Sequence, residues 1–294
     1  MIIDAHQHFW DVSRGDYSWL RPSDPILYQN YLPEDLVPLL SDSDVAATVL
    51  IQAAASELET QYLFRLAEEH SFIAGVVGWV DFDSPDADRR IANLIGEGQG
   101  KLKGLRPMIQ DILDADWVMQ STLDRVFESM VEHDLVFDAL VRPAHLPALR
   151  LRLMRHPALR VVLDHAGKPP IAAGDFDTWA SDLERLAQDT SAAVKVSGLL
   201  TEAGDRTTGE ELHPYVEHIF RCFGPSRMMW GSDWPVLNRA SRYGEWLHQS
   251  VAWVQRYSPQ NEEEIFARTA ARLYQLEIPP NPPHLSSPRS ASRE

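Results

Sequence analysis

Short apolar runs alternate with amphipathic segments along almost the whole chain, and this alternation restricts the fold more than any other feature. Eight of the runs have the length and composition of buried strands: Met1–Ala5, Ala47–Gln52, Ile73–Val80, Leu102–Arg106, Leu135–Val141, Arg160–Leu163, Ala193–Ser197 and Arg227–Gly231. The segments between them have helical patterns, and apolar strands that alternate with helices predict a parallel sheet covered by helices. Eight such units are what a (β/α)8 barrel requires, so we predict an α/β fold of this type.

The barrel pattern occupies residues 1–278, which we interpret as one domain. The segment 279–294 is rich in Pro and Ser and lacks apolar periodicity, so it is predicted to be disordered. Asp11–Tyr31 is rich in Trp, Tyr, Pro and Asp and is long for a loop. Because this loop follows the first strand directly, we expect it to cap the mouth of the barrel.

The charge and the cysteine content limit the classes of partner and the cellular location that we expect for this chain. The chain has 27 Lys and Arg against 43 Asp and Glu, and its net charge of −16 argues against binding to nucleic acid or to an anionic membrane. Cys222 is the single cysteine, so no intrachain disulfide forms. The first residues have the pattern of a strand rather than of a signal peptide, and the apolar stretches are short for a membrane span. We therefore predict a cytoplasmic protein, with a homodimer as one compatible assembly.

Two histidines end the first strand. His6 and His8 are two residues apart, and alternate residues of a strand point to the same face, so their imidazoles are expected side by side. The carboxyl end of a barrel strand is where active sites lie. Two neutral imidazoles at this spacing suit a divalent metal such as zinc, although two ligands alone do not complete a site.

Two further strands end in residues of the same chemical kind. The sixth strand is followed by Asp164 and His165, and the eighth by Asp233, each in a turn. His165 is a candidate metal or substrate contact, and Asp233 is a candidate general base or carboxylate ligand. Each also has a structural alternative, a loop hydrogen bond for His165 and a helix cap for Asp233. These structural alternatives are less convincing for the whole set of residues than for each residue alone, because all the residues lie at the same end of the strands.

Three charged residues complete the set of candidates. Arg106 ends the fourth strand, where its planar guanidinium could bind a carboxylate or polarise a carbonyl, or form a salt bridge at the rim. Lys195 lies on the seventh strand on the same face as Ser197, and a buried structural ion pair is the favoured interpretation for it. Glu202 follows in the next loop and is expected to reach the site.

Together these motifs resemble the amidohydrolase superfamily, and within it the sugar-lactone hydrolase branch of the L-fuconolactonase and L-rhamnonolactonase type. The resemblance runs from about residue 2 to residue 274 and is specific only as a set of motifs: Asp4–Trp10, Gly104–Arg106, Leu163–Pro169, Lys195–Leu199, Thr201–Ala203 and Gly231–Pro235. It implies a distorted barrel of the metal-dependent hydrolase type.

The resemblance also implies a mechanism and a set of site residues. An activated water would attack the carbonyl of an aldonolactone, with Asp233 as the base, His165 assisting proton transfer, and Arg106 or a metal polarising the carbonyl. The implied metal ligands are His6, His8, His165 and Asp233, with zinc favoured over manganese and metal-independent catalysis still open. The implied substrate contacts are Arg106, Trp234, Trp19, Tyr28 and Glu202.

Some residues depart from the pattern of the branch, and other functions stay open. Pro107 and Met108 follow Arg106 where fuconolactonases have His-Gln, and Thr269 replaces an Asn. The fifth strand lacks the carboxylated lysine of binuclear members, which argues for one metal or none. Arg106, Arg239 and Arg242 keep open an alternative substrate from aromatic catabolism, of the muconolactone or pyrone dicarboxylate type. A third interpretation is a non-catalytic barrel that acts as a binding protein.

Overall fold

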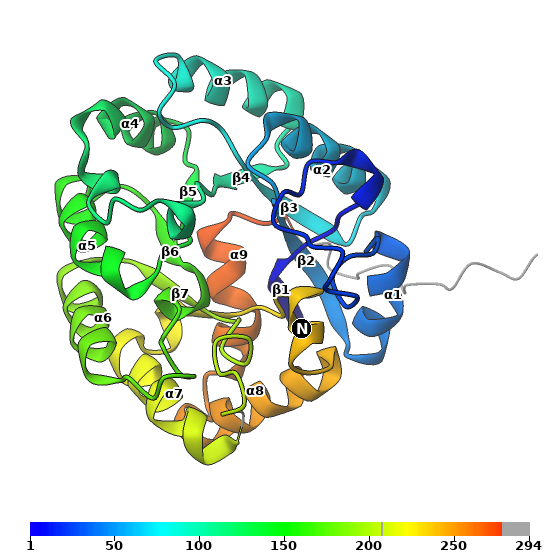
Figure 1. The fold of residues 1–294 in the computed structure, drawn as a ribbon, viewed down its shortest axis with the longest axis vertical. Coiled ribbons are helices and arrows are strands. Elements are labelled where there is room, and N and C mark those ends of the chain that lie inside the picture. Colours follow the sequence, from blue (N-terminus) through cyan, green and yellow to red (C-terminus); the bar gives the residue numbers. More distant parts are fainter. Residues whose placement is uncertain (207, 278–294) are drawn as a thin grey trace, which may run out of the picture.

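Eight parallel strands form one sheet in the order β1 to β8, and helices surround it in a computed structural model that describes residues 1–206 and 208–277 (Figure 1). The strands are β1 Ile2–Gln7, β2 Val45–Ile51, β3 Ile73–Gly78, β4 Leu102–Leu105, β5 Val136–Ala139, β6 Val161–Leu163, β7 Ala193–Val196 and β8 Met228–Trp230. Each predicted strand is present with its ends shifted by only a few residues. The predicted (β/α)8 barrel is confirmed, and the predicted tail 279–294 lies outside the described residues.

Helices connect the strands around the outside of the barrel (Figure 1). They are α1 Pro33–Asp42, α2 Glu57–Glu69, α3 Ala87–Gly98, α4 Asp124–Glu132, α5 Leu146–Arg155, α6 Asp177–Asp189, α7 Gly209–Phe223 and α8 Tyr243–Tyr257, followed by the π-helical turn η9 Glu264–Arg268 and α9 Thr269–Leu273. In the described residues, no helix combines the length and the apolarity that crossing a membrane requires.

The barrel closes between the first strand and the residues that follow the last. The backbone N–H of Asp233 donates to the carbonyl of His6 at 2.7 Å, and the N–H of His8 donates to the carbonyl of Trp234 at 2.8 Å. The buried carboxylate of Asp4 bridges this seam, because its Oδ1 accepts the N–H groups of both His6 and Ser232. The seam therefore fixes the end of β1 directly beside the turn after β8, and the barrel is distorted there.

Apolar side chains fill the barrel below this seam, and η9 and α9 close the end of the barrel opposite to it. Ala267 and Ala270, from η9 and α9, belong to the same buried cluster as Ile3, Val49 and Met229 from the strands. Helix α9 is seen inside the ring of strands in Figure 1. In the residues that the structure describes, the interior is thus a packed core, and the cavity over the barrel lies at the carboxyl ends of the strands.

Candidate active site

Four predicted side chains converge at the carboxyl ends of the strands. The Nε2 atoms of His6 and His8 lie 3.2 Å apart. Asp233 Oδ1 lies 3.6 Å from Nε2 of His6, 3.4 Å from Nε2 of His8 and 4.0 Å from Nε2 of His165. These distances place the three imidazoles and the one carboxylate around a single point, and all four side chains are buried.

The Nδ1 atoms of the three histidines face protein groups instead. Nδ1 of His8 lies 2.8 Å from the carbonyl of Ile51, and Nδ1 of His165 lies 2.9 Å from Oγ of Ser197. Nδ1 of His6 lies 3.2 Å from Nζ of Lys195 and 3.4 Å from Asp164 Oδ1. Histidines that bind metals commonly donate their second N–H to a carbonyl or hydroxyl oxygen, as His8 and His165 can here, which fixes the ring and directs the free nitrogen toward the ion.

Burial keeps the histidines neutral, and the histidines around Asp233 keep its carboxylate ionised. Desolvation lowers the pKa of His6 and His8, and it lowers that of His165 to about 4. Burial alone would raise the pKa of Asp233, but the histidines around it hold it well below its ordinary value. Neutral imidazoles and an ionised carboxylate are the protonation states that a divalent metal requires of its ligands.

The spacing of the ligand atoms also fits a metal. Zinc bound by nitrogen at about 2.0–2.1 Å in a tetrahedron keeps its ligand atoms about 3.3 Å apart. The three distances among His6, His8 and Asp233 range from 3.2 to 3.6 Å. One atom each of His6, His165 and Asp233 also lie within 4.8 Å of one another. The residues therefore fit one metal ion.

A left-handed turn directs His165 into the site. His165, Ala166, Gly167 and Lys168 all have positive φ, at 52°, 50°, 70° and 54°. This conformation costs roughly 1–2 kcal/mol per non-glycine residue, and such strain concentrates at functional sites. The turn directs His165 to the centre of the site and Lys168 to its mouth.

Gly198 provides the space for the His165 ring, so we predict a large effect of Gly198→Ala. An added Cβ would lie 2.6 Å from Nδ1 of His165, and the φ of +65° is unfavourable for alanine. We expect the ring to shift and kcat/KM of the lactonase reaction proposed below to fall by about 100-fold, the usual cost of a misplaced catalytic group. Gly100→Ala is the matched control, because its φ is +86° and its Cβ would meet open space. Equal activity losses in both variants would contradict the prediction.

A cavity of about 260 Å³ opens above the four side chains. Its wall combines apolar and polar groups: His8, Trp19, Ala53, Arg106, Met108, Gln110, Asp111, Leu140, His165, Lys168, Thr201, Glu202, Asp233, Val236 and Arg239. Arg106 is 3% exposed, and its Nη1 lies 3.4 Å from Nε2 of His6. A guanidinium at this point can donate to a carbonyl oxygen bound over the histidines.

The structure brings only some of the predicted substrate contacts to this cavity. Trp19 lines it and anchors the loop Asp11–Tyr31 through a 2.7 Å bond from its Nε1 to the carbonyl of Ala53. Glu202 also lines it. Trp234 does not, because it is buried edge-on against Phe9 and Tyr31. Tyr28 is 40% exposed and is also absent from the lining. Neither Trp234 nor Tyr28 lines this cavity, so their contact with a substrate stays a prediction.

Two buried carboxylates near the site have roles that the sequence did not reveal. Lys195 Nζ lies 2.5 Å from Asp138 Oδ2 and 3.1 Å from Asp164 Oδ1, which confirms the predicted buried ion pair of this lysine. Arg106 Nη1 lies 3.5 Å from Asp164 Oδ2. Burial would raise the pKa of Asp164, but Lys195 and the neighbouring positive groups hold it well below its ordinary value. Asp164 already followed a strand in the sequence, which was the one available signal.

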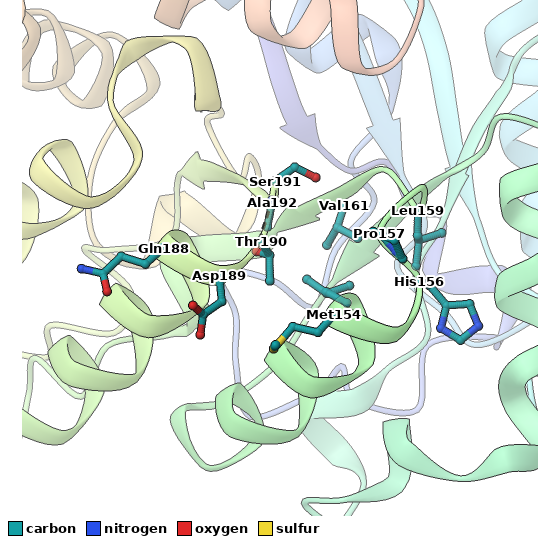
Figure 2. Close-up of a pocket in the computed structure, with 11 residues that line it drawn as sticks. Met154, His156, Pro157, Leu159, Val161, Gln188, Asp189, Thr190, Ser191 and Ala192 are labelled. Atoms are coloured by element: carbon teal, nitrogen blue, oxygen red, sulfur yellow. Dashed lines mark hydrogen bonds between the residues drawn. The ribbon is translucent and has the colours of Figure 1, made fainter.

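The α4 start and a second cavity are of less consequence for function. Ser121–Leu123 form a 3-10 turn directly before α4, and Asp124 pairs with Arg152. A cavity of about 480 Å³ lies between the C-terminal ends of α5 and α6, at the opposite end of the barrel. Its two titratable residues, His156 and Asp189, lie on opposite sides (Figure 2). His156 and Asp189 therefore do not converge on one point, whereas the four side chains of the candidate active site do.

Comparison with known proteins gives matches over nearly the whole chain. The family model described as "Amidohydrolase" matches residues 3–276. An L-fucono-1,5-lactonase of Burkholderia ambifaria is 41% identical over 286 residues, covering 96% of this chain and 98% of the relative. An L-fucono-1,5-lactonase of Burkholderia multivorans is 37% identical, covering 94% and 97%.

Solved structures are also similar to this chain over nearly its whole length. The crystal structure of an amidohydrolase from Burkholderia multivorans with bound zinc is 36% identical, with a TM-score of 0.86 over 94% of this chain and all of that one. A probable 2-pyrone-4,6-dicarboxylic acid hydrolase from Acinetobacter baumannii, with citric acid bound, has a TM-score of 0.76 at 16% identity, over 94% and 99%. At that identity the second likeness shows the fold alone.

Proposed function

The chain belongs to the amidohydrolase family, and from this membership we propose that it hydrolyses a sugar lactone, L-fucono-1,5-lactone first of all, to the open sugar acid. The observation that carries the proposal is the convergence of His6, His8, His165 and Asp233 below a cavity lined with polar groups. The two Burkholderia relatives are L-fucono-1,5-lactonases. The reaction is the hydrolysis of a carboxylic ester.

We assign one divalent ion to the site, with zinc as the first choice and manganese as the second. His6, His8 and His165 would hold it through Nε2, and Asp233 through a carboxylate oxygen. When bound, such an ion polarises a carbonyl and lowers the pKa of a water molecule. The zinc-containing structure of the Burkholderia multivorans amidohydrolase supports this choice.

The chain's own residues then perform the proton transfers. Arg106 donates to the lactone carbonyl oxygen and stabilises its negative charge as water adds to the carbon. Asp233 takes a proton from that water. The bond between the carbonyl carbon and the ring oxygen breaks, and Asp233 passes the proton to the released oxygen. The products are the hydroxyl group and the carboxylic acid of the open sugar acid, and the acid then releases its proton to the solvent and becomes a carboxylate.

The charges at the mouth favour a neutral polyhydroxylated lactone over an aromatic dicarboxylate. Lys168 Nζ lies 2.7 Å from Glu202 Oε1, and Arg239 Nε donates to Asp24 Oδ2 at 2.9 Å. Both cations are therefore already paired with carboxylates. Arg242 lies at the start of α8 and is absent from the cavity lining. A substrate with two carboxylates would have to displace these partners, whereas sugar hydroxyls can bind to paired charges.

The test is a pH-indicator assay of acid release from a panel of lactones. The panel contains L-fucono-, L-rhamnono- and galactonolactones together with muconolactone-type and pyrone lactones. We expect fast turnover of the sugar lactones, lost after chelation and restored by zinc or manganese. Activity with the acidic lactones alone would indicate a substrate from aromatic catabolism. No activity with any lactone would favour a binding protein.

Two further properties are proposed from the sequence. A cytoplasmic location is supported by the single cysteine, Cys222, which cannot form an intrachain disulfide. A homodimer is compatible with the sequence, and a measurement of the mass in solution distinguishes it from a monomer.

A further inference from the structure

A buried carboxylate, that of Glu59, lies behind the wall of the cavity and binds two backbone N–H groups. Its Oε1 and Oε2 both accept the N–H of Ala53 at 3.0 Å, and Oε2 also accepts the N–H of Ala54 at 2.6 Å. Glu59 is 0% exposed. Burying a carboxylate costs free energy unless hydrogen bonds compensate for the lost water, and these N–H groups provide them.

Glu59 does not cap the helix to which it belongs. Ser56 precedes α2 and Glu59 follows three residues later, which is the pattern of a capping box, where the glutamate accepts the N–H of the N-cap residue. Here the N–H of Ser56 donates to the carbonyl of Ala54 at 2.9 Å instead. The carboxylate of Glu59 therefore reaches past the start of α2 to the segment that follows β2.

The two N–H groups belong to peptide units whose carbonyls bind side chains of the cavity. In a planar trans peptide the C=O and the N–H point in opposite directions. The unit with the N–H of Ala53 has the carbonyl of Gln52, which accepts Nη2 of Arg106. The unit with the N–H of Ala54 has the carbonyl of Ala53, which accepts Nε1 of Trp19 at 2.7 Å. The buried carboxylate thus binds one edge of both units, and the two side chains bind the opposite edge.

We propose that Glu59 is a positioning residue, which orients these two peptide units and so holds Arg106 and Trp19 at the substrate. Both side chains line the cavity, and Trp19 also anchors the loop Asp11–Tyr31. The inference rests on the proposed function, in which Arg106 donates to the lactone carbonyl. It adds that one carboxylate outside the cavity lining sets the position of two residues in that lining.

Glu59→Gln tests this role. A glutamine has one acceptor oxygen, and whichever way its amide is turned, the NH₂ group faces the N–H of Ala53, which both oxygens of Glu59 contact. We expect the two peptide units to tilt and kcat/KM with the best sugar lactone to fall by about 10- to 100-fold. Because burial raises the pKa of Glu59 to about 7, the rates are measured at pH 8, where its carboxylate is ionised.

Glu57→Gln is the matched control. Glu57 also lies in the first turn of α2, so its substitution removes the same favourable charge from the helix N-terminus. Its carboxylate pairs with Arg90 at 2.8 Å and is absent from the cavity lining. We expect kcat/KM of Glu57→Gln to equal that of the wild type. Equal losses in the two variants, or no loss in Glu59→Gln, would overturn the inference.

A double-mutant cycle with Trp19→Phe separates positioning from a general loss of stability. Phenylalanine keeps an aromatic ring but lacks the N–H that binds the carbonyl of Ala53. If Glu59 acts in part through Trp19, the double variant loses less activity than the product of the two single losses. Independent losses that multiply would overturn the inference. If Glu59→Gln does not fold, the cycle is run with Glu59→Asp, whose shorter side chain withdraws both acceptors from the N–H groups.

A second measurement reports the position of Trp19 without any turnover. The chain has nine tryptophans, and the indole signal that disappears from the ¹H–¹⁵N spectrum of Trp19→Phe belongs to this residue. We expect this signal to shift in Glu59→Gln and to stay in place in Glu57→Gln. An unshifted signal in Glu59→Gln would overturn the inference, whether or not a lactone is hydrolysed. Absence of turnover in the wild type would instead overturn the proposed function.

Discussion

Asp233→Asn should retain the fold and lose most of the lactonase turnover. Asparagine has the shape of aspartate but neither its charge nor its basicity, and removing a positioned base costs typically 10²–10⁴-fold. We expect a loss near the upper end, about 10⁴-fold in kcat/KM, because Asp233 also lies within 3.6 Å of Nε2 of two histidines and is a proposed metal ligand. Initial rates with the best lactone of the panel measure this effect.

The backbone conformation at Asp233 also suits asparagine, so a loss of turnover in Asp233→Asn can be attributed to the loss of the carboxylate. Asp233 has a φ of +58°, and asparagine tolerates the left-handed region as well as aspartate does. The main-chain bond from its N–H to His6 at 2.7 Å does not depend on the side chain. Asp44→Asn is the matched control, because Asp44 has a φ of +52° and lies outside the site. Near-normal turnover in Asp233→Asn would exclude this carboxylate as the base.

The sequence was sufficient for the fold and for the centre of the site, since both depend on local pattern. Each apolar strand is recognisable by itself, and a parallel barrel places the residue after each strand at the same end. His6, His8, His165 and Asp233 could therefore be placed together without knowing how any strand packs. The shared position at strand ends was the only geometric information that the prediction needed.

The partners across the barrel could not be predicted in the same way. Lys195 and Asp138 are 57 residues apart in sequence, and the contact of Tyr274 with Asp138 spans 136 residues. Such pairs are set by the packing of distant elements and leave no local pattern. The direction of the Trp234 ring is a similar case, because the sequence places this residue beside Asp233 but does not show that its ring packs against Phe9 and Tyr31.

The zinc affinity should be nearly independent of pH between pH 7 and pH 5. Protons compete with zinc for imidazole nitrogen, so three ordinary histidines with a pKa of about 6.5 would lose about 10⁴-fold in affinity over this range. Here burial lowers the pKa of all three, that of His165 to about 4, so the lone pairs stay available at lower pH. We expect the affinity to fall by far less than about 10⁴-fold between pH 7 and pH 5, and protonation of His165 to reduce it further near pH 4.

Chelator competition at pH 7, 6 and 5, corrected for protonation of the chelator, measures this dependence. The stability of the metal-free protein also decreases as the pH falls, because the unfolded chain binds protons on His165 from about pH 6.5 downward and the folded chain only near pH 4. His165 therefore makes the metal-free fold less stable as the pH falls through this window, while bound zinc opposes the loss. A 10³-fold or greater loss of zinc affinity between pH 7 and pH 5 would show that the histidines titrate as exposed ones do, and would contradict the buried neutral site on which the proposed chemistry depends.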